Sequence, residues 1–218
     1  MMRNLKRMAE DTLTREMIEE DVKEFSHKYC NGGTVYDIGG VQRYSYRKYF
    51  SEYKTINFDK AERPDILASA ERMPFKDGSV DNFLCLAMLE HTREPEATIR
   101  EMYRTMKKGG RALIWVPFYW REHNYPIDNC RYTSQGIISL LEKHGFRIIE
   151  SSTDRYSGLF FILSHNVRFM MKDPHRIRTY DPLLCIHAAL YKLGGLDSAL
   201  NLRHPNLYTG VSVVAEKR

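Results

Sequence analysis

The chain has 218 residues, of which 43% are hydrophobic and 28% charged. This is the balance of an ordinary globular protein, and the length suits one sizeable α/β domain better than two. The net charge of +5 is small and spread along the chain. A basic block of the kind that grips phosphates is absent from the sequence, so nucleic acid is not expected as a partner.

The four cysteines stand far apart, with no C-x-x-C pair and no histidine at zinc-binding spacing. We interpret Cys30, Cys85, Cys130 and Cys185 as reduced thiols of a cytoplasmic protein, and we expect no metal site. The first twenty residues carry charges without a long apolar core, so no signal peptide is expected. No run reaches the roughly 20 apolar residues that a membrane-spanning helix needs.

Residues 1–30 predict an amphipathic helical segment, because apolar side chains from Leu13 to Phe25 fall near one face. Gly32 and Gly33 then interrupt the helix. From there strands and helices alternate, which predicts a parallel, doubly wound sheet. Strands are expected at 34–38, 54–58, 65–68, 80–86, 111–117 and 146–150, helices after Pro95 and after the capping residue Thr133, and a last strand at 208–215 whose alternation is typical of a sheet edge.

Several segments carry a family resemblance: VYDIGG from Val35, NFD from Asn57, ILASAERMPFKDGSVDNFLCLAMLEH from Ile66, and MKKGGRALIWVPF from Met106. In this order they resemble the class I S-adenosylmethionine-dependent methyltransferases, and most closely the UbiE-like, type 11 branch that acts on small molecules. The resemblance covers about residues 34–152. It implies a Rossmann-like α/β fold with a mostly parallel seven-stranded sheet and an antiparallel last strand, and it implies S-adenosylmethionine as cofactor.

We expect a single domain with four parts: a helical segment (1–30), a cofactor-binding core (31–154), a helical insertion (155–207) and a last strand (208–218). Parallel sheets bind ligands at the carboxyl ends of their strands. The resemblance implies that a glycine turn there receives the methionine end of the cofactor, that Asp59 accepts the ribose hydroxyls, and that another turn reads adenine. The implied cofactor-binding residues are Asp37, Gly39, Gly40, Arg43, Asp59, Ser69, Ala70, Glu71, Leu86 and Ala87.

Three positions depart from the family pattern. Val41 and Arg43 stand where the family has glycines, and Ser69 stands where it tends to have aspartate. A β-branched Val41 does not adopt a positive φ cheaply, so the loop takes another path or the alignment shifts by a residue. Arg43 is equally consistent with pairing to the cofactor carboxylate and with an ordinary surface position.

Methyl transfer to a hydroxyl needs a group that removes a proton. The candidate bases are His91, after the fourth strand, and His123, in the loop after the fifth. Asp128 is a candidate for orienting a histidine, Arg131 for gripping an anionic acceptor, and Tyr132 completes the polar cluster. The alternative, equally weighted for the loop residues, is a structural hydrogen-bond network that fixes the loop.

The insertion contains two apolar-rich stretches that predict helices, LFFILSHNVRFMM and LLCIHAALYKLGGL. We expect them to cover the acceptor pocket. A membrane-facing or dimer-forming surface is the alternative, because basic residues flank the stretches. His165, His175 and His187 are interpreted as surface or packing residues.

The main functional hypothesis is methyl transfer to a small-molecule or glycan-precursor acceptor. Oxygen is the expected methylated atom, and nitrogen or carbon is the alternative. A glycan precursor is suggested by the His, Pro-x-Asp and Arg-Tyr-Thr pattern after the fifth strand. This pattern resembles that of methyltransferases that accompany sugar-modifying enzymes. The alternative is a catalytically degenerate binding or scaffold protein with the same fold. A nicotinamide dehydrogenase is disfavoured because G-x-G-x-x-G is absent.

Overall fold

The computed structural model describes residues 13–30, 32–123, 127–153, 157–170, 186, 189–190, 193, 196–197, 199–202 and 206–218. These residues form two compact units. One unit comprises the described residues within Glu19–Phe118, Glu122–Ser152 and Gly210–Arg218, and the other comprises those within Met1–Ile18, Tyr119–Arg121 and Thr153–Thr209. The assignment of the whole chain to a single domain stays a prediction.

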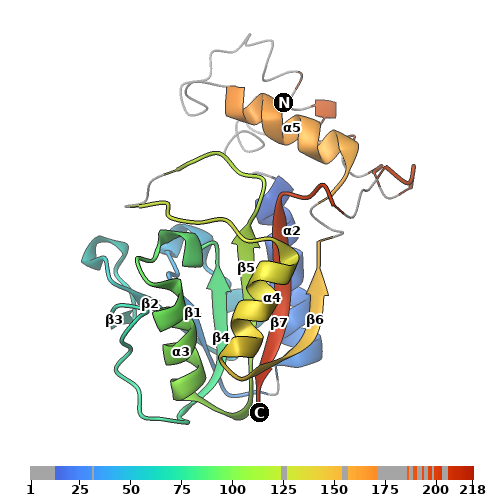
Figure 1. Ribbon diagram of the computed structural model, residues 1–218. Helices are drawn as coiled ribbons and strands as arrows, with labels where there is room; N and C mark the ends of the chain where they lie inside the picture. Colours follow the sequence, from blue (N-terminus) through green and yellow to red (C-terminus); the bar gives the residue numbers. More distant parts are fainter. Residues whose placement is uncertain are drawn as a thin grey trace. The chain divides into compact units, whose positions relative to one another are not determined.

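The larger unit is built on a seven-stranded sheet with the strand order β3-β2-β1-β4-β5-β7-β6 (Figure 1). All pairs are parallel except β5–β7 and β7–β6, which are antiparallel. This confirms the predicted Rossmann-like sheet. The strands are β1 (Thr34–Ile38), β2 (Glu52–Asn57), β3 (Ile66–Leu67), β4 (Val80–Leu86), β5 (Met106–Pro117), β6 (Phe146–Ser152) and β7 (Gly210–Lys217).

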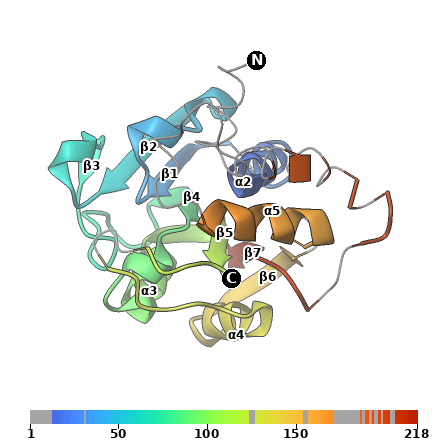
Figure 2. The ribbon, with the colours of Figure 1, turned by 90° about the horizontal axis from the view of Figure 1, so that it is seen from above.

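Helices cover both faces of this sheet. Helices α3 (Pro95–Thr105) and α4 (Ser134–Lys143) lie on one face, and the second half of α2 (Leu13–Glu24) lies on the other, as the view from above shows (Figure 2). A π-helical turn, Phe25–Tyr29, continues α2. Thr133 caps α4 as predicted, because its Oγ1 accepts a hydrogen bond of 3.0 Å from the backbone N–H of Gly136.

The prediction that the last strand lies at the sheet edge is wrong. Strand β7 lies between β5 and β6 and hydrogen-bonds to both. Its alternating pattern has a packing cause: Ser212 is opposite Trp115, and a Cβ on Gly210 would lie 2.2 Å from Cζ2 of the same indole. Small residues are therefore needed beside Trp115, and Ser212 is only 7% exposed.

The smaller unit contains helix α5 (Leu159–Met170), which confirms the first helix expected in the insertion. Asp197 anchors its beginning by accepting hydrogen bonds from the backbone N–H groups of Phe160 (3.0 Å) and Phe161 (2.9 Å). The second expected helix, residues 183–196, lies mostly outside the described residues, as do His175, His187 and the side chain of His165. Within the described part of the chain, no helix has the length and apolar character needed to cross a membrane.

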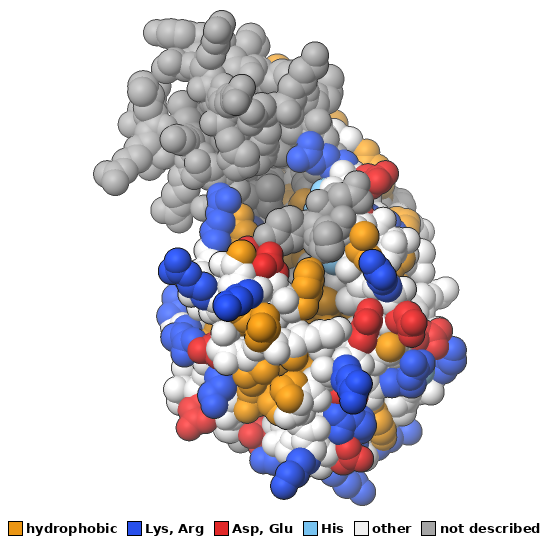
Figure 3. All heavy atoms as spheres, turned by 90° about the vertical axis from the view of Figure 1, so that its left-hand side faces the viewer, with side chains coloured by type: hydrophobic (Ala, Val, Ile, Leu, Met, Phe, Trp, Pro, Cys, Tyr) orange, Lys and Arg blue, Asp and Glu red, His pale blue; other side chains and the backbone are white. Residues whose placement is uncertain are grey.

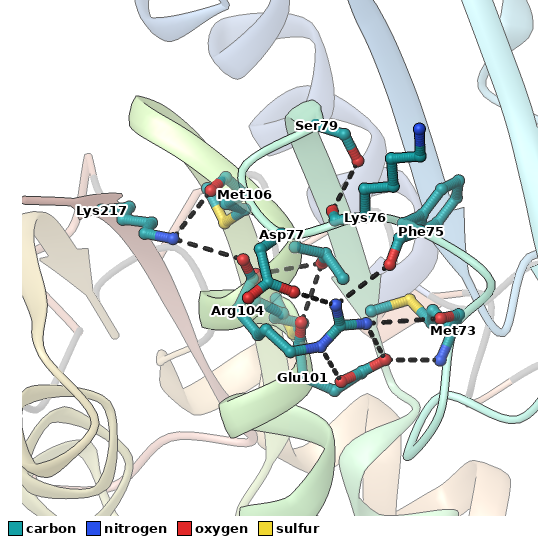
Figure 4. A network of polar contacts seen from close by, with 11 residues as sticks. Met73, Phe75, Lys76, Asp77, Ser79, Glu101, Arg104, Met106 and Lys217 are labelled. Carbon is teal, nitrogen blue, oxygen red and sulfur yellow. Dashed lines mark hydrogen bonds and ion pairs between the residues drawn. The ribbon is translucent and has the colours of Figure 1, made fainter.

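A polar network joins α3 to the segment that precedes β4 (Figure 4). The Arg104 guanidinium donates to both carboxylate oxygens of Glu101 (2.8 and 2.7 Å), to the Phe75 carbonyl (3.0 Å) and to the Asp77 carboxylate. Glu101 also accepts a hydrogen bond of 2.7 Å from the Met73 N–H. The network therefore anchors the segment 73–77, which follows one of the predicted cofactor-binding turns.

This network makes a pH-dependent contribution to stability. Hydrogen bonds from Arg104 lower the pKa of Glu101 against the opposing effect of burial. Since the folded-state pKa lies below the unfolded value of about 4.3, the contribution is present above that pH and is lost as the pH falls below it. We expect Glu101→Gln to cost about 1–2 kcal/mol at pH 7 and less at pH 3, measured by urea unfolding. Glu142→Gln, at an exposed position of α4, should change little at either pH; an equal effect of the two variants would contradict the account.

Candidate functional site

The predicted site residues lie at or after the carboxyl ends of β1, β2, β3, β4 and β5. Along the sheet, β1 lies between β2 and β4, so the chain proceeds outward in one direction from β1 to β3 and in the other from β4 to β5. Such a reversal of strand order creates the crevice in which open α/β sheets bind ligands. We call this edge of the sheet the rim.

The glycine turn after β1 packs closely against neighbouring side chains. Gly39 has a φ of +77°, and its N–H donates to the Ile56 carbonyl at 2.8 Å. A Cβ on Gly40 would lie 2.9 Å from the Asp37 carboxyl carbon and 2.9 Å from Cγ2 of Thr55. The turn therefore requires glycine at both positions.

Asp37 lies beneath this turn and is 3% exposed. The hydroxyl of Tyr53 donates to its carboxylate in a short hydrogen bond. Burial, followed by the charge of Asp37, raises the pKa of Tyr53, so the phenol keeps its proton and remains a donor. In this structure Asp37 supports the turn from within the sheet.

The loop after the glycine turn takes the path that Val41 requires. Val41 has extended backbone angles (φ −119°, ψ 147°), and a 3₁₀ turn follows over Gln42–Tyr44. Arg43 is exposed, with its guanidinium carbon 5.3 Å from the ring centroid of Tyr44. The expectation that Val41 avoids a positive φ is confirmed, and a cofactor contact of Arg43 stays a prediction.

Asp59 follows β2 and has a structural role of its own. Its Oδ1 accepts a hydrogen bond of 2.8 Å from the Ala61 N–H and caps the 3₁₀ turn Lys60–Glu62. This fixes the carboxylate at the rim. Two large apolar side chains nearby are exposed, Phe58 at 63% and Leu67 at 57%. Figure 3, which views the β3 side of the molecule, shows apolar side chains gathered on this face between charged ones.

The turn predicted to read adenine is formed as expected. Ser69 and Arg72 make an isolated β-bridge, and the Glu71 N–H donates to Ser69 Oγ at 3.2 Å. Glu71 in turn accepts a hydrogen bond of 3.2 Å from the N–H of Glu94, just before α3. The side chains of Ser69 and Glu71 therefore both stabilise the turn through hydrogen bonds.

Ala87, after β4, has a feature that the sequence did not indicate. Its φ is +51°, in the left-handed region that residues other than glycine rarely occupy, and its N–H donates to the Trp115 carbonyl at 3.0 Å. Strained backbone of this kind gathers at functional sites. It directs the chain from Leu86 into the short 3₁₀ turn Leu89–His91.

The structure brings together the two histidines that the sequence separates by 32 positions. The ring centroids of His91 and His123 are 4.8 Å apart, in a T-shaped arrangement. His91 Nδ1 lies 2.6 Å from the Ile127 carbonyl, and His123 Nδ1 lies 3.2 Å from Asp128 Oδ2. Because a carbonyl and a carboxylate accept hydrogen bonds, we assign the proton of each neutral ring to Nδ1, which leaves the lone pair on Nε2.

Asp128 holds this loop in place. Its carboxylate accepts two hydrogen bonds from the Arg131 guanidinium, one of them 2.6 Å long, and one of 2.8 Å from the His123 N–H. The hydrogen bonds from Arg131 lower the pKa of Asp128 despite its burial, so the carboxylate is ionised. Arg131 was predicted as a candidate to grip an anionic acceptor. Its terminal nitrogens instead bind Asp128, which favours the loop-fixing alternative for this residue.

Tyr132 also contributes to the loop. Its hydroxyl oxygen accepts a hydrogen bond from the Cys130 thiol, with a distance of 3.3 Å between the oxygen and Sγ. The backbone N–H of Tyr132 donates to the Pro117 carbonyl at 3.3 Å. Burial raises the pKa of Tyr132, so its phenol stays neutral. A catalytic role for Tyr132 stays a prediction.

Sequence reasoning did not select Glu90, which the structure places beside the histidines. Its side chain is fully buried, and its Oε1 lies 3.8 Å from Nε2 of His91. The ligand atoms of Glu90, His91 and His123 all lie within 4.8 Å of one another. The only signal in the sequence was the adjacency of Glu90 and His91.

Comparisons with known proteins agree with this geometry. Residues 41–114 match the family model described as a methyltransferase domain. An uncharacterized methyltransferase of Mycobacterium sp. (strain JLS) is 26% identical over 177 residues, which cover 73% of this chain and 68% of the relative. An uncharacterized protein of Methanocaldococcus jannaschii is 39% identical over 98 residues, so the match spans about half the length of that relative (48%) and 40% of this chain.

Among solved structures, an S-adenosylmethionine-dependent methyltransferase from Archaeoglobus fulgidus has the same fold. Its TM-score is 0.62 at 14% identity, with 93% of this chain and 94% of the other chain covered. Residues 41–114 thus match a methyltransferase domain, and the chain has the fold of an S-adenosylmethionine-dependent methyltransferase. Its place in the UbiE-like branch stays a prediction.

Proposed function

We propose that this protein transfers the methyl group of S-adenosylmethionine to a hydroxyl group of a small-molecule or glycan-precursor acceptor. The observation that carries the proposal is the arrangement of the rim. The glycine turn after β1, Asp59 after β2, and the pair of His91 with His123 after β4 and β5 belong to neighbouring strands of one sheet.

The rim residues fit the parts of S-adenosylmethionine. The Gly39–Gly40 turn, which directly follows β1, suits the methionine end. The carboxylate of Asp59 suits the two ribose hydroxyls, which are hydrogen-bond donors. The exposed side chains of Phe58 and Leu67 provide apolar surface of the kind on which a purine packs. The turn Ser69–Glu71 then supplies polar groups for the edge of the adenine.

The histidine pair fits the acceptor side of the reaction. S-adenosylmethionine supplies a methyl group that is already activated by its sulfonium. An acceptor oxygen forms the new C–O bond, the S–CH₃ bond breaks with its electrons going to sulfur, and the hydroxyl proton has to leave. The Nε2 lone pairs of His91 and His123 can receive that proton, because the protonated Nδ1 atoms are held by the Ile127 carbonyl and Asp128.

A binding or scaffold protein with the same fold is the alternative function. Two observations favour it: Val41 and Arg43 replace family glycines, and Arg131 binds Asp128 rather than facing an acceptor as a free cation. The two functions differ in outcome. A scaffold binds the cofactor and transfers no methyl group, whereas the enzyme converts it to S-adenosylhomocysteine in the presence of an acceptor.

The contribution of Asp59 tests the proposal. We expect Asp59→Ala to weaken S-adenosylmethionine binding about 30-fold, because hydrogen bonds to a charged group contribute about 1.5–3 kcal/mol. Isothermal titration calorimetry measures the change. Glu62→Ala, which removes a carboxylate from the same turn, should leave the affinity within about twofold. Equal affinities of the wild type and Asp59→Ala would contradict the assignment of the ribose site.

A further inference from the structure

We propose that Glu90, His91 and His123 bind one divalent transition-metal ion, with Zn²⁺ as the best match. Their ligand atoms already lie within 4.8 Å of one another. The site goes beyond the proposed methyl transfer and does not depend on it, since metal binding is measured without an acceptor. It revises the expectation, drawn from sequence spacing, that the chain has no metal site.

His91 is oriented as a metal ligand. Its Nδ1–H donates to the Ile127 carbonyl at 2.6 Å, which fixes both the ring and its tautomer. The Nε2 lone pair then points to the side of Glu90, whose Oε1 is 3.8 Å away. A histidine that ligates a metal usually donates its other ring N–H to a carbonyl or carboxylate in this way.

His123 repeats the arrangement with a carboxylate. Asp128 Oδ2 lies 3.2 Å from His123 Nδ1 and accepts the His123 backbone N–H at 2.8 Å. Arg131 holds Asp128 from the other side. Carboxylate–histidine pairs of this kind raise the basicity of the ligating nitrogen and hold the ring in place. Both histidines therefore have an independent support at Nδ1.

The ligand set identifies the class of ion. Two imidazole nitrogens and one carboxylate oxygen suit Zn²⁺ and similar transition metals, whereas Ca²⁺ and Mg²⁺ prefer oxygen ligands alone. Three protein ligands leave one position open, as in catalytic zinc sites. Ligand atoms bound to one zinc ion are roughly 3.3 Å apart, so the most distant pair must approach by about 1.5 Å. His123, whose side chain is 32% exposed, has the freedom to move.

An ion in this position would take over the proton-removing role of the histidines. A Zn²⁺ ion lowers the pKa of a bound hydroxyl, so the acceptor would lose its proton to solvent while both Nε2 atoms stay bound to the metal. The open position also suits an acceptor with a hydroxyl beside a carboxylate or carbonyl oxygen. The expected methyl acceptors would then be molecules whose oxygen atoms can bind Zn²⁺.

Metal titration of the full chain tests the proposal. The tag-free protein is treated with dipicolinate, dialysed, and titrated with Zn²⁺ by calorimetry and with Co²⁺ by visible absorption. We expect one ion per chain with a micromolar or tighter dissociation constant. The Co²⁺ spectrum should show a nitrogen- and oxygen-ligated ion without the charge-transfer band of a thiolate ligand.

Matched variants locate the site. His123→Gln should weaken Zn²⁺ binding at least about 100-fold, and Asp128→Asn about 10–100-fold, while His27→Gln, at an exposed position, should have no effect. Near-ultraviolet circular dichroism confirms that each variant is folded. Wild-type binding no tighter than millimolar, or His123→Gln binding as tightly as wild type, would overturn the proposal. A protein that binds S-adenosylmethionine but not Zn²⁺ would contradict only the proposed metal site. A protein that binds Zn²⁺ but not S-adenosylmethionine would contradict only the proposed function.

Discussion

Replacing Gly39 with alanine is expected to destabilise the protein by about 2–4 kcal/mol, because a backbone penalty and a steric overlap add. The φ of Gly39 is +77°, which an L-residue adopts only with strain. A Cβ there would also lie 2.5 Å from Cγ of Met88. Cβ of Met88 would lie 3.2 Å away as well, so rotation of the Met88 side chain relieves only part of the overlap. Chemical unfolding measures the loss.

Gly109 provides the matched control. Its φ of +76° is nearly identical, and a Cβ on Gly109 would meet nothing within 4 Å. Gly109→Ala should therefore show the backbone penalty alone, about 1–2 kcal/mol. If the two variants lose equal stability, the contact between the glycine turn and Met88 is not a constraint, and the account of the turn is wrong.

Removing the carboxylate of Asp128 is expected to cost about 3–4 kcal/mol, because it leaves the Arg131 charge without its ion pair. The side chain of Asp128 is 1% exposed and that of Arg131 is 23% exposed, so solvent replaces the lost partner poorly. Asp128→Ala also removes the acceptor of the His123 N–H. The measurement is the free energy of unfolding at pH 7.

Two further variants separate the destabilisation caused by the unpaired Arg131 charge from that caused by the loss of ordinary contacts. In the double variant Asp128→Ala with Arg131→Met, no unpaired charge remains, so the loss should be smaller than for Asp128→Ala alone. Glu96→Ala breaks the exposed ion pair with Lys143 and should cost less than about 1 kcal/mol. A loss from Asp128→Ala as small as that from Glu96→Ala would show that the loop does not depend on this pair.

The sequence predicts the sheet well where strands are buried on both faces. The bounds of β1 and β4 are those expected, because each is a short apolar run between turn signals. Strand β7 was misplaced because alternation has two causes. Small residues at Gly210 and Ser212 make room for Trp115, and from sequence alone this pattern is the same as one face exposed to solvent. Only the pairing partner distinguishes the two.

The candidate site was predictable in part. Residues next to strand ends, such as Gly39, Asp59 and His91, could be assigned to the rim because the carboxyl ends of parallel strands share one edge. The contact of His91 with His123 depends on the path of a loop, which no local pattern encodes. The same holds for Arg131, whose partner Asp128 is three residues away but is chosen by the fold of that loop.

The backbone of Ala87 illustrates a further limit. A left-handed φ at a residue other than glycine contradicts local preference, so sequence reasoning cannot anticipate it. It is held by the hydrogen bond from the Ala87 N–H to Trp115 of the neighbouring strand. Tertiary structure here overrides the local propensity, and it does so beside the rim.

Binding of S-adenosylhomocysteine to the wild-type protein tests the central claim most directly, because it needs no knowledge of the acceptor. We predict one site per chain with a micromolar dissociation constant in calorimetric titration, and competition by S-adenosylmethionine for the same site. A folded protein that binds neither compound would contradict the account, and would mean that the turn with Val41 and Arg43 no longer forms a cofactor site.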